Sequence, residues 1–157
     1  MERLKSFVPT EDKLNDLIQK LQDNRLYLSD ENRDKETAAA VVMSHFYFGK
    51  ESEFYEIGDW QGLIGVVDIV PGWRGELFFK LWDKSAWGPS LRRELSEAMD
   101  TICDKYKLER VSLSTPDEHT AKIAESHGFV IEGVLKNSFK WDGVSYDTIC
   151  LGLDRRN

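Results

Sequence analysis

The residues with the clearest chemical potential lie between Leu81 and Arg93, in the sequence LWDKSAWGPSLRR. A strand-like run ends there and a long helical pattern begins. The first turn of a helix carries N–H groups without backbone partners and a partial positive charge. Gly88 lets a ligand approach the backbone, because it has no Cβ atom. Ser90 can cap the helix, and Lys84, Arg92 and Arg93 add positive charge, so a phosphate or pyrophosphate could bind here.

The same residues also have a simpler interpretation. A capped helix after an ordinary turn, with Arg92 and Arg93 in solvent, would show the same pattern. A single glycine before a helix is weak evidence for a phosphate site. Both interpretations therefore stay open at this point.

Two strands and a long helix must position this segment. Gly62–Val70 is β-branched and nearly continuous in apolar residues, which predicts a central strand. Pro71-Gly72 is a turn signal, and Glu76–Trp82 is the returning strand of an antiparallel hairpin. A strand at Arg110–Ser114 follows the helix, so the order predicts a βαβ unit with parallel outer strands. The helix carries one apolar stripe: Leu91, Leu95, Ala98, Met99, Ile102, Cys103 and Tyr106.

The N-terminal third reads as two helices and a short strand. Thr10 can cap a helix whose apolar residues have i, i+3, i+4, i+7 spacing: Leu14, Leu17, Ile18 and Leu21. The polar run Ser29–Lys35 is a loop, too short to separate two domains. Glu36–Phe48 is expected to be a second helix, and Ser52–Ile57 a strand.

The C-terminal third reads as a short helix and a hairpin. Pro116 ends the preceding strand, and Glu118–His127 is a helix that Gly128 stops. Asp142-Gly143 is a strong hairpin signal between two strand-like runs, Val130–Trp141 and Val144–Leu153.

Length and charge limit the class of protein. A chain of 157 residues is expected to form one domain over 1–157, and its net charge of −7 argues against broad nucleic-acid binding. No apolar stretch approaches the roughly 20 residues that span a bilayer, and the start MERLKSFVPT lacks the apolar core of a signal peptide. Cys103 and Cys150 lack metal-ligand spacing, so we expect buried thiols in a cytoplasmic, reducing compartment.

The stretch from Trp87 to Leu153 resembles the GNAT superfamily of N-acetyltransferases. AKIAESHGFVIEG, at residues 121–133, is similar to the family's short helix, Gly-Phe and Glu-Gly sequence. The run VLKNSFKWDGVSYDTICLGL resembles the closing hairpin of the branch that acetylates ribosomal proteins. VPG at 70–72 and STP at 114–116, together with HGFVIEG, resemble small GNAT-like proteins of tailed bacteriophages.

This resemblance implies an α/β fold: a mixed, mostly antiparallel and splayed sheet with a central βαβ unit and flanking helices. It also implies that acetyl-CoA enters the split between two parallel strands. The pantetheine arm would then meet Phe79, Lys80, Leu81 and Trp82. The diphosphate would lie on the loop and helix start at Trp87, Gly88, Ser90, Leu91 and Arg92.

The cofactor loop departs from the family's pattern. Ser85 stands where the family has Gln or Arg, and Ser90 replaces a second small residue. Pro89 offers no N–H to a phosphate, although it can preset the first helical turn. The family's Asn before the short helix aligns with Glu118, and its Tyr general acid aligns with Ala124. These departures predict weakened cofactor binding.

Acetyl transfer to an amine needs a base for the ammonium proton and an acid for the leaving thiolate. Glu118 is the first candidate base, because it follows the second parallel strand; a carboxylate that favours the helix N-terminus is the alternative. Glu76 is a further candidate, and Asp68 lies beside the same hairpin. The alternative for both is an exposed carboxylate at the rim of the site or a structural role, because most carboxylates are exposed. His119 is the candidate acid, or else an exposed helix residue. No ligand spacing predicts a metal site.

Three functions remain as alternatives. The first is an acetyl-CoA-dependent N-acetyltransferase acting on an amine of a protein or small molecule. The second is a non-catalytic GNAT-like module, such as a phage virion or head-assembly protein, in contact with phage structural proteins or with copies of itself. The third is an acyl-CoA-binding regulator. Trp73 and Trp87, placed in loops, could line a substrate mouth or an interface.

Overall fold

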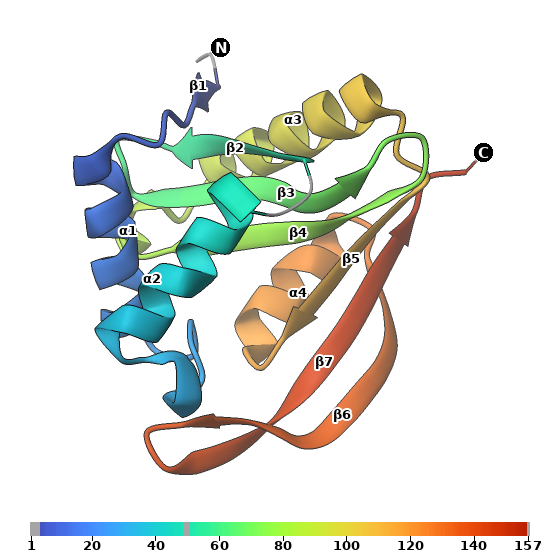
Figure 1. Cartoon of the computed structure of the whole chain (residues 1–157). Helices are drawn as coiled ribbons and strands as arrows, with labels where there is room; N and C mark the ends of the chain where they lie inside the picture. Colours follow the sequence, from blue (N-terminus) through green and yellow to red (C-terminus); the bar gives the residue numbers. More distant parts are fainter. Residues whose placement is uncertain (1–3, 49–50, 157) are drawn as a thin grey trace.

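One mixed sheet organises the chain. A computed structural model describes residues 4–48 and 51–156, and there it shows seven strands in the order β1-β2-β3-β4-β5-β7-β6 (Figure 1). Every neighbouring pair is antiparallel except β4 and β5, which are parallel. The expected mostly antiparallel mixed sheet is therefore confirmed. Its strands are β1 (Lys5–Ser6), β2 (Glu51–Ile57), β3 (Gly62–Val70), β4 (Arg74–Leu81), β5 (Arg110–Thr115), β6 (Val130–Trp141) and β7 (Val144–Asp154).

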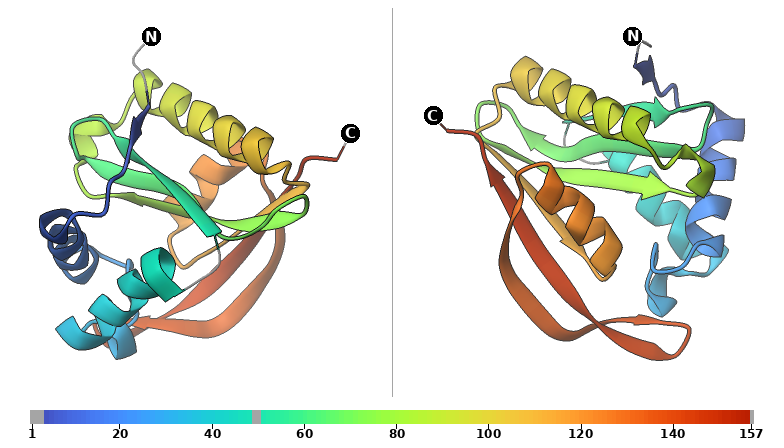
Figure 2. Two further views of the ribbon diagram at one scale, coloured as in Figure 1. Left: turned by 45° about the horizontal axis from the view of Figure 1, so that its top comes forward. Right: turned by 180° about the vertical axis from the view of Figure 1, so that it is seen from behind.

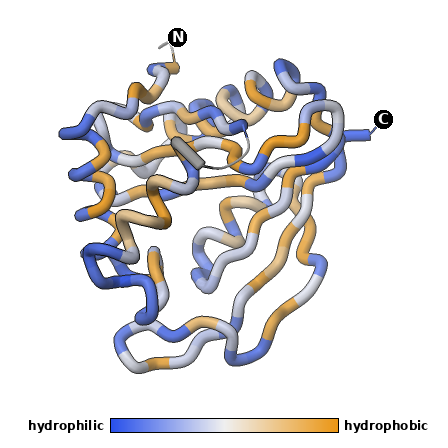
Figure 3. Tube along the Cα trace, viewed as in Figure 1, coloured by the Kyte–Doolittle hydropathy of each residue, from blue (hydrophilic) through white to orange (hydrophobic). Residues whose placement is uncertain are grey.

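Helices cover both faces of this sheet. α1 (Glu11–Asp23) and α2 (Lys35–Met43) pack on one face, and α3 (Pro89–Tyr106) and α4 (Glu118–Ser126) on the other (Figure 2). Each face has its own apolar cluster, and β3 contributes to both because its first six residues are all buried. Along α1 apolar residues recur about once per turn between polar ones, as the colours in Figure 3 show, so the helix has one apolar side.

The local sequence signals correctly predicted most elements. β3 covers Gly62–Val70 as expected and forms the predicted hairpin with β4. The C-terminal hairpin turns at Asp142 and Gly143, whose φ values of 52° and 77° are those of the tight turn that such a dipeptide favours. Helix α4 ends as predicted, with Gly128 at φ 96°.

Two helix boundaries differ from the expectation. The expected helix Glu36–Phe48 is α-helical only to Met43, and a π-helical turn covers Ser44–Phe48. Phe46 packs against Phe7 and Phe54 from other elements, so tertiary contacts decide the path of this turn. The prediction that Ser90 caps the long helix is wrong. Gly88 is the N-cap and Pro89 the first helical residue, because proline is preorganised for that position.

The sheet order and the shortest strand were not anticipated. β7 pairs with β5, which leaves β6 at the sheet edge. β1 has two residues, too few to show a pattern, and pairs with β2. Of the two cysteines, Cys103 is buried, as expected, and Cys150 is only partly buried. Burial raises the pKa of the Cys103 thiol to about 11.

Candidate active site

The parallel strands β4 and β5 separate soon after they meet. They pair at three positions only, Arg74 with Arg110, Gly75 with Val111 and Glu76 with Ser112. β4 then continues to Leu81 and β5 to Thr115 without pairing with each other, and the two strands diverge in Figure 1. A cavity of about 300 Å³ lies along the divergent halves, with walls that include residues 77–80 and 113–115. We call it the split cavity.

The residues expected to meet pantetheine lie on both faces of β4. Phe79 and Leu81 pack in the cluster under α3 and α4, whereas Trp82 packs in the cluster under α1 and α2. Lys80 lines the split cavity on this second side. On the α3 side, the space beside Phe79 is a small apolar void of about 20 Å³. The room along β4 therefore lies mainly on the side of α1 and α2.

Tyr27, between α1 and α2, reaches the end of β4. Its hydroxyl accepts a hydrogen bond from the Leu81 N–H at 2.8 Å and donates one to the Leu81 carbonyl. Burial raises the pKa of Tyr27 to about 12. Sequence reasoning missed this residue, because nothing local marks a tyrosine that bonds a strand 54 positions away. The hydroxyl occupies backbone groups of the kind that the predicted cofactor would use.

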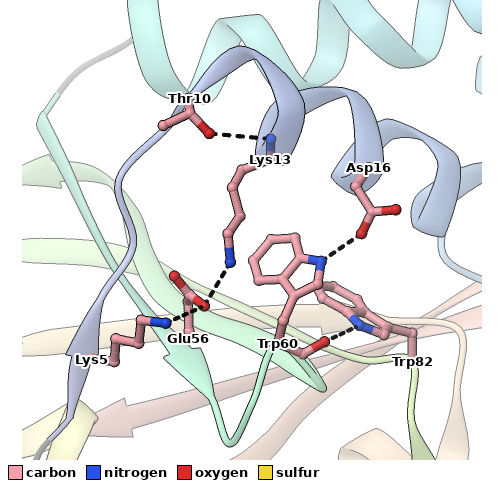
Figure 4. A network of polar contacts seen from close by, with 7 residues as sticks. All are labelled: Lys5, Thr10, Lys13, Asp16, Glu56, Trp60 and Trp82. Atoms are coloured by element: carbon pink, nitrogen blue, oxygen red, sulfur yellow. Dashed lines mark hydrogen bonds and ion pairs between the residues drawn. The ribbon is translucent and has the colours of Figure 1, made fainter.

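Trp82 is held by a polar network that also fixes α1 (Figure 4). Its indole N–H donates to the Trp60 carbonyl at 2.7 Å, and the Trp60 indole donates to Asp16 at 2.5 Å. Nearby, the buried Glu56 accepts from Lys13 at 2.9 Å. The side chain of Trp82 thus serves the packing of α1, and its backbone N–H donates to the Gln61 carbonyl at 3.1 Å.

The start of α3 retains features of an anion site. Gly88 has φ 155°, and a Cβ there would meet nothing within 4 Å, so the space beside it is open. No side chain caps this helix end, although the Leu91 N–H donates to the Gly88 carbonyl at 3.1 Å. Lys84 donates to the Leu81 carbonyl at 3.1 Å, between the split and this helix end. Arg92 is exposed one turn into the helix.

The two helix starts meet through a pair of aromatic rings. Trp87, before α3, contacts His119, in the first turn of α4, edge to face with ring centroids 4.7 Å apart. The structure therefore brings one predicted cofactor residue against the predicted acid. The contact bridges the two helices beside the open end of the split.

The first turn of α4 borders a larger hollow. Asp117 caps the helix and accepts from the His119 N–H at 3.2 Å and from the Thr120 hydroxyl at 2.9 Å. Asp117, Glu118 and His119 line a hollow of about 800 Å³, which we call the outer hollow. It shares Asp117 with the split cavity, as well as Leu26 and Pro116.

Solved structures of known acetyltransferases share the fold of this chain. Spermidine N-acetyltransferase from Vibrio cholerae, in complex with CoA and spermine, matches 97% of this chain and 95% of its own with a TM-score of 0.73 and 16% identity. A chimera of that enzyme with hSSAT matches 98% of this chain and 95% of its own at a TM-score of 0.69 and 17% identity. The chain has the GNAT fold. No protein-family model matches the sequence, and no curated protein does.

The GNAT fold separates the predicted catalytic residues into two groups. Glu118 and His119 lie together at the open end of the split. Glu76 lies on the exposed start of β4, where the strands still pair, and it lines neither the split cavity nor the outer hollow.

Within residues 4–48 and 51–156, no three His, Cys, Asp or Glu side chains gather as metal ligands would. The same residues contain no helix with the length and apolar character to cross a bilayer.

Proposed function

We propose that this protein transfers an acetyl group from acetyl-CoA to an amine. The observation that carries the proposal is the early parting of β4 and β5, with a cavity of about 300 Å³ between their free halves. The similarly folded spermidine N-acetyltransferase from Vibrio cholerae binds CoA and spermine, which supports this use of the split.

The residues present fit acetyl-CoA, with local obstacles at Pro89 and at Leu81. Open space at Gly88 and the uncapped start of α3 suit the diphosphate, although Pro89 provides no amide. Along β4, the backbone at Phe79 and Leu81 would hold the pantetheine arm once Tyr27 releases Leu81 and Lys84 releases its carbonyl. Other contacts to the bound cofactor would come from Trp82, Trp87, Ser90, Leu91 and Arg92. The Lys80 side chain lies on the opposite face of β4 from Phe79 and Leu81, so it takes no part in this cofactor contact.

Acetyl-CoA would supply an acetyl group activated as a thioester. Glu118 would accept the proton that the amine loses, directly or through water, because it is exposed in the outer hollow. His119, held against Trp87, would donate a proton to the leaving thiolate. Glu76 lies at the closed end of the split and takes no part in this proposal.

Cofactor binding tests the proposal directly. Saturating acetyl-CoA should raise the melting temperature, since a ligand at about 100 times its Kd stabilises the folded state by about 2.7 kcal/mol. Release of free CoA thiol in the presence of amines would then report turnover. The absence of any thermal shift at millimolar acetyl-CoA would refute the proposal.

A second candidate function is protein contact without catalysis, as in a phage virion or assembly component or a self-associating module. The edge strand β6 favours it, because Val130 and Leu135 are 64% and 56% exposed there. Light scattering after size exclusion should then show a stable assembly that acetyl-CoA does not affect. A monomer at all concentrations would remove self-association from consideration.

A further inference from the structure

Lys80 carries an ammonium group in the split cavity. It lies on the free half of β4, where β5 no longer pairs. Its Nζ lies 4.8 Å from the centroid of the Tyr27 ring and 5.9 Å from that of Phe78. Within the described part of the chain, no hydrogen bond or ion pair reaches this ammonium group. A lysine in this position has unused hydrogen-bonding capacity.

The surroundings of Lys80 leave its charge poorly compensated. Burial lowers the pKa of Lys80 to about 8, and the negative charge of Asp117 opposes this shift. Asp117 is already engaged, because its carboxylate accepts from the Thr120 hydroxyl and the His119 N–H. An anion that entered the cavity would therefore gain a strong, charge-assisted contact with Lys80.

Charge also argues against a purely cationic acceptor. A polyamine would place further positive charge next to Lys80, with little water between the two. The Asp117 carboxylate lies where the split cavity adjoins the outer hollow, and Glu118 beside it lines that hollow. Both carboxylates suit an ammonium group. The site thus offers one positive and one negative region a short way apart. A cavity of about 300 Å³ suits a small molecule.

We propose that the acceptor is a small amine that also bears a carboxylate, the arrangement found in an amino acid, and that Lys80 binds that carboxylate. The acceptor's amine faces Asp117 and Glu118, while its carboxylate lies against the ammonium of Lys80. The role as acceptor rests on the proposed acetyl transfer, whereas carboxylate binding by Lys80 is a property of the free protein and can be measured without cofactor.

The first experiment follows Lys80 in the full chain by NMR, with carbon-13 at the lysine ε position. The twenty common amino acids are added singly in the absence of cofactor. At least one is expected to shift the Lys80 signal and to raise its pKa, while spermidine does not. If no amino acid perturbs the signal, or if spermidine does so more strongly, the inference is wrong, whatever the acetylation result.

The second experiment compares matched substrates by release of CoA thiol. Each amino acid that binds is paired with its decarboxylated amine, for example tyrosine with tyramine or lysine with cadaverine. The carboxylate-bearing member should have a kcat/KM at least tenfold higher. A preference for the decarboxylated amine, or no preference, overturns the inference. Binding of an amino acid at Lys80 without acetylation of any amine would instead refute the proposed transferase function alone.

A pair of variants separates recognition from a structural role. Lys80→Met should lower kcat/KM at least tenfold for the amino acid and less than twofold for its decarboxylated partner. Lys35→Met, at the exposed start of α2 and lining neither cavity, should change neither value. An equal loss on both substrates in Lys80→Met overturns the inference. If Lys80→Met does not fold, the wild-type NMR and substrate comparisons decide the matter without it.

Discussion

Replacing Tyr27 with phenylalanine removes one hydroxyl and both of its hydrogen bonds to Leu81. A typical intramolecular hydrogen bond contributes about 0.5–1.5 kcal/mol, and a buried group left unpaired costs about 1–3 kcal/mol. The adjacent cavity of about 300 Å³ can admit water to the freed backbone groups, which limits the cost. We therefore expect Tyr27→Phe to lower the free energy of unfolding by about 1–2 kcal/mol. In a chain of this size the melting temperature should fall by about 2–8 °C.

The same change should have the opposite effect on acetyl-CoA. In the wild type, a ligand that uses the Leu81 backbone must first displace the Tyr27 hydroxyl. In Tyr27→Phe the Leu81 N–H is free and the Leu81 carbonyl keeps only its contact with Lys84, so the cost of displacing the tyrosine hydroxyl disappears from the binding free energy. A gain of about 1–2 kcal/mol corresponds to a Kd about 5- to 30-fold lower.

Isothermal titration with acetyl-CoA and thermal unfolding measure the two effects on the same samples. Tyr55→Phe is the matched control, because it also loses a single hydroxyl, one that donates to Glu53 at 3.0 Å on β2, away from the split. Its Kd for acetyl-CoA should equal that of the wild type. An unchanged or higher Kd in Tyr27→Phe would refute the argument that the cofactor replaces Tyr27 at Leu81.

Three further predictions test other parts of the site. Gly88→Glu should abolish acetyl-CoA binding by charge repulsion. Gly88→Ala bears the same backbone strain at φ 155°, and isothermal titration should show a Kd within about threefold of the wild type. Equal loss of binding in both variants would mean that backbone strain, and not anion binding, is responsible. Glu118→Gln should slow thiol release about 10²- to 10⁴-fold, which is the usual contribution of a general base. Glu125 is exposed on the same helix, and Glu125→Gln should leave the rate of thiol release unchanged. Equal rates in the two variants would remove Glu118 from the mechanism. Lys80→Met should raise the free energy of unfolding at pH 7 by about 1–3 kcal/mol, because the folded state holds an ammonium whose pKa burial lowers to about 8. Between pH 8 and the ordinary pKa of 10.5, the unfolded chain binds more protons at this residue than the folded protein does. The free energy of unfolding of the wild type should therefore rise relative to that of Lys80→Met as the pH increases through this range. Denaturation curves that show a constant difference between the two proteins would contradict this.

Local sequence determined most of the elements around the site. Asp142-Gly143 specifies its turn through positive φ, and Gly128 ends α4 for the same reason, so both features could be predicted from neighbouring residues. Pro89 likewise sets the start of α3, where Gly88 and not Ser90 is the N-cap. The similarity of residues 121–133 to the GNAT superfamily indicates the fold in the sequence itself.

The interior of the site was decided by tertiary structure alone. Whether β4 and β5 separate after Glu76 depends on the packing of whole strands and helices, and no single residue signals it. Tyr27 reaches Leu81, and Trp87 reaches His119, across long stretches of sequence, and propensities that act over a few residues contain no information about such contacts. Lys80 is the clearest case. In the sequence it is one lysine within a strand. Its burial beside Tyr27, with no hydrogen bond or ion pair to any described residue, is what makes it a candidate for recognising a ligand.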